Sequence, residues 1–212
     1  IFLHHAFDEW MRTNHPGTPF ARYADDIIVH CRTEAQARVM LRVIERRLAR
    51  CKLQLHPEKT RIVYCKDAKR PGSYEHESFD FLGYSFRPRG CKGRSYFVGF
   101  TPAVSKSAIK AMSAAIRGWR LQLWSSSSLE DIAKQINPVI RGWLNYYGRY
   151  YRTAMYPILR QLQYALVRWA MRKYKRLRGH WLKATHWLSR IARREPRLIA
   201  AWQFGFRPSA GQ

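Results

Sequence analysis

Apolar side chains recur at helical spacing in the first residues of the chain, and an extended pattern follows. Four of them fall on one face of a helix: Leu3, Phe7, Trp10 and Met11. This spacing predicts a helix over residues 1–13, which the segment 14–19 with its proline and glycine ends. The β-branched run Ile27–Val29 then predicts a strand, turn and strand between Arg22 and His30.

A second helical pattern begins at Thr33. Thr33 and Gln36 have the spacing of a capping box. Apolar residues then line one face, which predicts a helix packed on a core: Ala37, Met40, Leu41, Ile44, Leu48 and Cys51. Residues 53–64 predict a strand, turn and strand, and residues 66–78 a polar loop.

The segment from residue 79 to residue 100 alternates and is rich in aromatic side chains. It predicts a hairpin with strands over 79–86 and 95–100, turning at Arg87–Gly90.

Helical periodicity dominates from Thr101 onward. We expect a long helix over 103–124, a linker over 125–128, and a further helix capped by Ser128 with Asp131 at its third position. Pro138 suits a first helical turn, so Asn137–Pro138 predicts a break before a helix that reaches Tyr147.

The last third of the chain predicts two more helices. One starts at Tyr156–Pro157 and runs to about Leu177, and an amphipathic helix lies in residues 180–212 before Trp202–Gly205. The predicted fold class is therefore α+β, with antiparallel hairpins and a helix in residues 1–100 and an all-α bundle in residues 101–212.

Charge divides the chain at the same place. The formal net charge is +25, and residues 101–212 hold 21 basic and three acidic side chains against 18 and 11 in residues 1–100. Seven of the eight tryptophans lie in the second half among these basic residues, which favours a nucleic acid over a membrane as partner. The alternative is a solvated basic face around an aromatic core.

Hydropathy and cysteine spacing add two expectations. No apolar run is long enough to cross a bilayer, so we expect no membrane partner. The four cysteines form no metal-binding or disulfide pattern, which is typical of reduced cysteines in a cytoplasmic protein.

Two adjacent carboxylates, Asp25 and Asp26, interrupt the first predicted hairpin. Like charges so close oppose each other's ionisation unless a positive charge lies between them. A divalent cation such as Mg²⁺ takes carboxylate oxygens and substrate phosphates together. The alternative for the dipeptide alone is an ordinary solvated turn.

Three motifs in order resemble one protein family. Tyr23-Ala24-Asp25-Asp26 resembles the Tyr-X-Asp-Asp hairpin of reverse transcriptases, and the Ala variant, within Arg22–Asp26, resembles the group II intron branch of that family. A helix followed by Leu53, Leu55, Lys59 and Thr60 is similar to the segment after that hairpin. Phe81-Leu82-Gly83 resembles the primer grip, although Gly83 alone also fits a strand bulge.

The segment 137–147 resembles the maturase-specific domain, the helical thumb of group II intron proteins. Its Arg141-Gly142-Trp143-Leu144-Asn145-Tyr146-Tyr147 carries the likeness. Arg141, Asn145 and Arg149 are candidates for phosphate contacts, and we expect Trp143 to pack rather than stack on bases. The densest basic run adds four RNA-binding candidates: Arg172, Lys173, Lys175 and Arg176.

The resemblance implies an RNA-directed DNA polymerase and intron-splicing maturase: part of a polymerase palm, then the thumb. Asp25 and Asp26 would bind Mg²⁺, Tyr23 and Ala24 would contact the nucleotide, and Lys59 would lie near the triphosphate. Phe81, Leu82, Gly83 and Tyr84 would form the primer grip. The implied partners are group II intron RNA, an RNA template with a DNA primer, and deoxynucleoside triphosphates.

The chain departs from the family pattern in one respect. The family's third catalytic Asp, on an earlier strand, and the template-binding fingers have no counterpart here, so we expect a cut chain that does not polymerise by itself. Because no Cys or His cluster occurs near Gln212, we also expect no His-Asn-His-type endonuclease domain in this chain. A non-catalytic RNA-binding splicing factor with a vestigial Asp pair is the alternative function, and a nuclease has little support.

Overall fold

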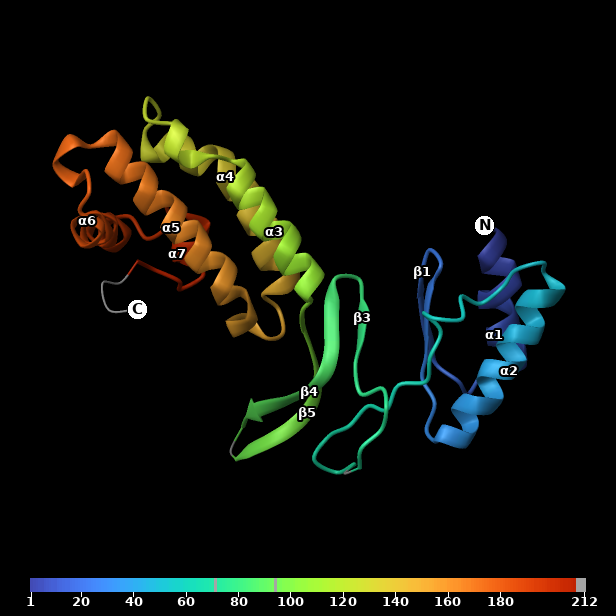
Figure 1. Cartoon of the computed structure of the whole chain (residues 1–212). Coiled ribbons are helices and arrows are strands. Elements are labelled where there is room, and N and C mark those ends of the chain that lie inside the picture. Colours follow the sequence, from blue (N-terminus) through green and yellow to red (C-terminus); the bar gives the residue numbers. More distant parts are fainter. Residues whose placement is uncertain (71, 94, 209–212) are drawn as a thin grey trace. The chain divides into compact units, whose positions relative to one another are not determined.

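The structure is a computed structural model that describes residues 1–70, 72–93 and 95–208 (Figure 1). Pro71 of the predicted polar loop, Arg94 and residues 209–212 of the predicted helical domain lie outside the described residues. The chain forms two compact units. The first contains Ile1–Leu82 and Arg87–Phe100, and the second contains Gly83–Phe86 and Thr101–Gln212. Strands and helices both occur, which confirms the α+β class.

The first unit opens with a helical segment, as its periodicity predicts. A π-helical turn, η1 (His4–Glu9), runs directly into α1 (Trp10–Asn14). Phe7 and Met11 are fully buried in the small core of this unit, together with residues of the next long helix. The first segment therefore presents its apolar face to the rest of the unit.

A two-stranded antiparallel hairpin follows, formed by β1 (Phe20–Tyr23) and β2 (Asp26–Val29). Phe20 pairs with Val29 and Arg22 pairs with Ile27. Paired residues of an antiparallel ladder point to the same face. Because Phe20, Ile27 and Val29 pack against the core, this is the inner face of the hairpin.

The helix α2 (Glu34–Arg50) begins where the capping pattern predicts. The Thr33 hydroxyl accepts a hydrogen bond from the Gln36 backbone N–H at 3.1 Å. Met40, Ile44 and Leu48 are buried against Phe7 and Met11. The predicted helix and its apolar face are both confirmed.

Residues 53–64 contain no strand, so the predicted strand, turn and strand are wrong. A strand needs a neighbour to complete its hydrogen bonds, and this segment makes other contacts. Leu53 and Leu55 pack on the core of the first unit, and the Tyr64 N–H donates to the His76 carbonyl at 2.8 Å. The apolar alternation here reflects docking of a loop.

A three-stranded sheet in the order β3-β4-β5 contains β3 (Phe79–Phe81), β4 (Tyr84–Lys92) and β5 (Tyr96–Val104). The turn predicted at Arg87–Gly90 is wrong, because β4 runs through these residues. The strand predicted over 79–86 is also wrong, because a turn at Leu82–Gly83 divides it, where both residues have positive φ angles of 51° and 75°. Positive φ at both central residues is the geometry of a tight hairpin turn that matches strand twist.

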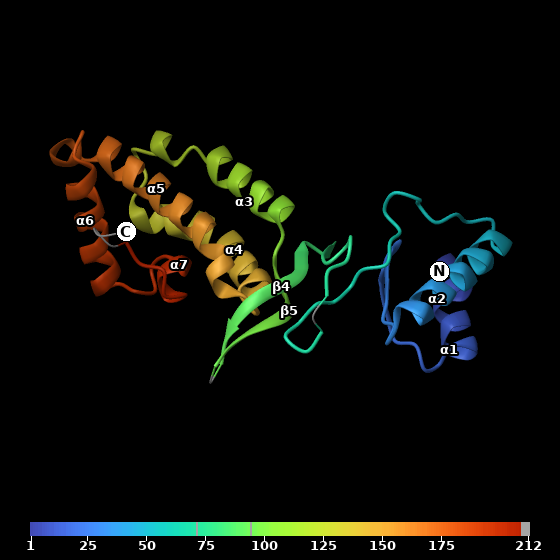
Figure 2. The same ribbon diagram turned by 60° about the horizontal axis from the view of Figure 1, so that its bottom comes forward.

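The second unit is a bundle of helices (Figure 2). The elements are α3 (Lys106–Gly118), η2 (Leu121–Leu123), α4 (Leu129–Tyr147), η3 (Arg152–Met155), α5 (Tyr156–Lys173), η4 (Lys175–Leu177), α6 (Trp181–Arg194) and α7 (Ala200–Gln203). Long α5 packs against α3, η2 and α6, and the buried apolar residues of the unit form one continuous core. No helix of the described residues is long and apolar enough to cross a membrane.

The observed starts of α3 and α4 test two of the predicted helix boundaries. The helix expected over 103–124 is shorter, because Ala103 and Val104 belong to β5 and the Ser105 hydroxyl caps α3 by accepting from Ala108 N–H. The cap at Ser128 with Asp131 is confirmed.

The break predicted at Asn137–Pro138 is wrong, since α4 continues through Pro138. An interior proline removes one helical hydrogen bond. Ile136 and Ile140, fully buried on either side, hold the helix in the core, and this packing outweighs the local cost.

A buried side-chain amide on α4 fixes the position of the segment that leads into α7. The Asn137 side chain donates to the Leu198 carbonyl and accepts from the Ala200 N–H, both at 2.8 Å. These bonds satisfy a backbone donor at the start of α7 that would otherwise be unpaired. Asn137 therefore joins α4 to α7.

The residues at the start of β4 pack on the far end of α4. The Tyr84 hydroxyl donates to the Tyr146 carbonyl, and its ring lies against Tyr146, Tyr147 and Tyr150 at centroid distances of 5.2 to 5.6 Å. A Cβ added at Gly83 would lie 2.6 Å from the Tyr147 hydroxyl. Only glycine fits this approach without movement.

We expect Asn137→Leu to lower the free energy of unfolding of the helical unit by about 2–3 kcal/mol, because it leaves the Ala200 N–H and the Leu198 carbonyl without their partner. Tryptophan fluorescence during urea unfolding measures this, since seven of eight tryptophans lie in residues 101–212. Gln135→Leu, on the exposed side of the same helix, is the control. Equal stability of the two variants would contradict the prediction.

We expect Gly83→Ala to cost about 1–3 kcal/mol in the same assay, because alanine is strained at positive φ and its Cβ meets the Tyr147 hydroxyl. In a Tyr147→Phe background the added cost should be smaller, since the hydroxyl is gone. Gly142→Ala is the matched control: a Cβ there meets open space within α4, so it should be neutral or stabilising. A destabilisation at Gly142 as large as at Gly83 would refute this account.

Candidate active site and nucleic-acid interface

The two candidate catalytic carboxylates lie at the tip of the first hairpin. Ala24 and Asp25 form the turn, and Tyr23 pairs with Asp26 across it. Tyr23 and Asp26 therefore share the outer face, away from the core, where Tyr23 is 64% exposed. The hairpin brings together four of the predicted site residues.

Asp25 and Asp26 are both exposed, and no hydrogen bond or ion pair to either side chain occurs within residues 1–70, 72–93 and 95–208. The same residues contain no group of three or more His, Cys, Asp or Glu side chains suited to a metal. Two free, adjacent carboxylates still fit a hard divalent cation, because Mg²⁺ is often bound by one or two carboxylates, with waters and substrate phosphates completing its shell.

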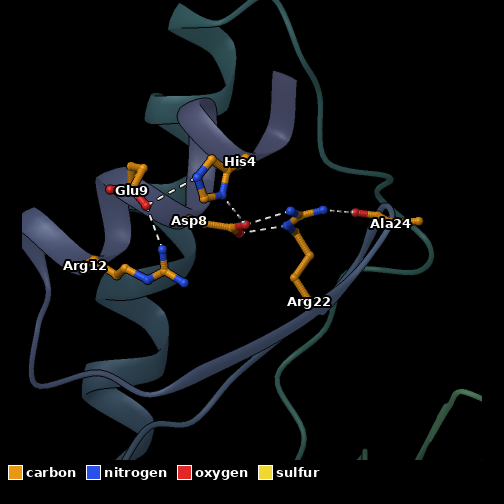
Figure 3. Close-up of polar contacts among 6 residues, drawn as sticks. All are labelled: His4, Asp8, Glu9, Arg12, Arg22 and Ala24. Atoms are coloured by element: carbon orange, nitrogen blue, oxygen red, sulfur yellow. Dashed lines mark hydrogen bonds and ion pairs between the residues drawn. The ribbon is translucent and has the colours of Figure 1, made fainter. Parts of the chain in front are cut away.

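Arg22 lies on the inner face of the hairpin, where a charged group requires a partner. Its Nε donates to Asp8 Oδ1 at 2.7 Å and its Nη2 donates to Asp8 Oδ2 at 2.6 Å (Figure 3). Asp8 belongs to η1 and is only 7% exposed. The pair therefore joins the helical segment to the strand that leads into the candidate catalytic turn.

A third nitrogen of the same guanidinium reaches the turn itself. Arg22 Nη1 donates to the Ala24 carbonyl at 2.7 Å (Figure 3). Ala24 has a φ of 52°, a conformation that L-residues with a Cβ rarely adopt. Arg22 thus holds a strained residue directly before the two carboxylates.

The charge of Arg22 also sets the ionisation of Asp8. The hydrogen bonds from the guanidinium lower the pKa of Asp8 below its ordinary value, against the opposing effect of burial, and His4 adds a smaller contribution. Asp8 is therefore ionised at neutral pH. Sequence reasoning did not find this pair; the only signal was an acidic residue beside Phe7 and near Met11, on the buried side of the first helix.

The remaining candidates of the reverse transcriptase pattern are dispersed. Lys59 is exposed in the loop after α2, and the described residues contain no hydrogen bond or ion pair between it and Asp25 or Asp26. The primer-grip candidates divide between the units: Phe81 and Leu82 belong to the first and Gly83 and Tyr84 to the second.

The RNA-binding candidates on α4 lie at its exposed surface. Arg141 and Asn145 are one helical turn apart, and Arg149 follows the helix end. Trp143 is half-buried and stacks on Trp119 with ring centroids 5.7 Å apart. The expectation that Trp143 packs within the protein is confirmed.

The densest basic run has two kinds of side chain. Arg172, at the end of α5, is exposed, as are Lys175 and Arg176 in η4, whereas Lys173 is half-buried. The Lys173 ammonium donates to the Ser125 carbonyl at 3.0 Å and lies 6.0 Å from the centre of the Trp169 ring. Lys173 thus has a role in holding the linker before α4.

Comparison with known proteins supports the same division of the chain. Residues 1–86 match the family model for reverse transcriptase (RNA-dependent DNA polymerase), and residues 109–187 match the model for the group II intron, maturase-specific domain. No curated protein matches the chain. Since both matches occur in this order on one chain, the protein belongs to the reverse transcriptase and maturase family encoded by group II introns, a family of RNA-directed DNA polymerases.

Proposed function

We propose that this chain contributes Asp25 and Asp26 to a Mg²⁺-dependent site for RNA-templated DNA synthesis. The observation that carries the proposal is the pair of exposed carboxylates at the hairpin tip, within a segment that matches reverse transcriptase. When bound, Mg²⁺ would neutralise charge on the phosphates and lower the pKa of the attacking hydroxyl. Deoxynucleoside triphosphates and a primed RNA template are the substrates in this proposal.

The other residues of the segment bind and orient the substrates. Tyr23 presents an exposed ring on the outer face of the hairpin beside Asp26, suited to contact with an incoming nucleotide, while the Ala24 backbone shapes the turn. Lys59 would offset triphosphate charge. The turn at Leu82–Gly83, flanked by Phe81 and Tyr84, would approach the primer backbone.

The helical unit would bind the intron RNA and the template-primer duplex. Its core buries Trp169 and Trp202, and four more tryptophans pack partly buried against that core, while basic side chains remain at the surface. Phosphate contacts by such side chains supply most of the affinity for nucleic acid. The proposed contacts are Arg141, Asn145, Arg149, Arg172, Lys173, Lys175 and Arg176.

A non-catalytic splicing factor is the second candidate function. The excess of 21 basic over three acidic residues in 101–212 supports RNA binding whether or not the hairpin holds metal. In this case the Asp25–Asp26 pair would be vestigial. We further propose a cytoplasmic location, which the four free cysteines support.

We expect Asp25→Asn and Asp26→Asn each to weaken binding of Mn²⁺, used as a paramagnetic substitute for Mg²⁺, by about tenfold or more, because each removes a charged oxygen ligand. Electron paramagnetic resonance of free Mn²⁺ measures the affinity. Asp80→Asn, an exposed aspartate in β3, is the control. Unchanged Mn²⁺ binding in both hairpin variants, with RNA binding intact, would favour the non-catalytic factor.

We expect Arg141→Gln and Arg149→Gln each to reduce affinity for a structured RNA. The slope of log K against log salt concentration should become shallower by about 0.7–0.9 for each phosphate that the variant no longer neutralises. Fluorescence anisotropy at several salt concentrations measures both. Arg12→Gln is the control, since this exposed arginine of the first unit is already paired with Glu9 at 2.6 Å. An unchanged salt slope in the α4 variants would remove these residues from the RNA interface.

A further inference from the structure

We propose that Asp8 and Arg22 act as a positioning pair for the candidate metal site. In this inference Asp8 keeps the Arg22 guanidinium away from Asp25 and Asp26, and Arg22 holds the turn that carries them. The inference rests on the proposed function, because it concerns the same two carboxylates.

The first argument is that each of the three guanidinium nitrogens donates a hydrogen bond. Arg22 directs Nε and Nη2 to Asp8 and Nη1 to the Ala24 carbonyl, all within 2.6 to 2.7 Å (Figure 3). Two parallel bonds to one carboxylate fix both the distance and the plane of an arginine. The third bond can then form only in one orientation of the side chain.

The second argument is charge. Arg22 lies three residues before Asp25 and contacts the residue next to it. Without Asp8, its positive charge would be uncompensated beside the turn and would repel a divalent cation there. Because the Asp8 side chain is only 10% exposed, water weakens its pairing with Arg22 little. Asp8 therefore neutralises Arg22 at a place where free cationic charge would compete with metal.

The third argument is the strain at Ala24. A non-glycine residue at positive φ persists only when its surroundings hold it there. The bond from Arg22 Nη1 and the ladder pair between Tyr23 and Asp26 are constraints on this turn. The conformation of Ala24 sets the directions in which the next two side chains leave the backbone.

Substitutions at Asp8 and Arg22, with Mn²⁺ affinity as the readout, test the proposal on the full chain. Asp8→Asn should weaken Mn²⁺ binding by about fivefold, because Arg22 keeps its charge and no longer has a charged partner. The double variant Asp8→Asn with Arg22→Gln should regain part of the affinity, since the competing cation is gone although the bond to the Ala24 carbonyl is lost with it. A purely structural role predicts no such recovery.

The control is an exposed ion pair on α2. Arg38 and Glu34 are also 2.6 Å apart, and both side chains are exposed. Glu34→Gln should leave Mn²⁺ affinity within about twofold of the parent chain, because an exposed pair is screened by water. Circular dichroism of each variant confirms that the fold is retained.

The outcomes separate this inference from the proposed function. Parent-like Mn²⁺ binding by Asp8→Asn, while Asp25→Asn loses it, would overturn the inference and leave the metal site intact. Weakened binding in Asp8→Asn with no recovery in the double variant would also overturn it, because a damaged fold then explains the weaker binding. Retained binding in Asp25→Asn and Asp26→Asn would overturn the proposed function, and the inference with it.

Discussion

A charged side chain that faces a hydrophobic core must be neutralised where it lies, and the Asp25–Asp26 hairpin depends on this constraint. The ladder places Arg22 on the same face as Phe20 and Ile27, which pack on the helices of the first unit. Asp8 accepts the guanidinium there and offsets the cost of burying Arg22 beside these apolar residues. One ion pair therefore links the packing of the hairpin to the strand that leads to the two exposed carboxylates.

The helical unit uses several of its tryptophans for packing. Trp169 is fully buried and donates to the Trp124 carbonyl at 2.9 Å, while Trp143 stacks on Trp119. Exposed arginines and lysines of the same unit remain at the surface for a polyanion. This arrangement supports RNA binding through phosphates more than through stacking on exposed tryptophans.

The sequence correctly predicted the elements whose structure depends on residues close together in the chain. The Thr33 and Ser128 caps, the apolar face of α2 and the turn at Asp25 all depend on residues within a few positions of one another. The errors arose where distant residues decide the outcome. Helix α4 continues through Pro138 because its neighbours are buried, and residues 53–64 dock as a loop. The bond between Asp8 and Arg22 spans 14 positions, and no spacing rule predicts it.

The boundary between the two units passes through a single hairpin. Gly83–Phe86 belongs with the helices, whereas Arg87–Phe100 belongs with the palm segment. A helical unit inherited or expressed from Thr101 onward would lack Tyr84 and leave the tyrosines at the end of α4 without the ring that packs on them. Gene recombination that exchanged thumbs between such proteins would therefore keep this tyrosine cluster intact only if the crossover preceded Gly83.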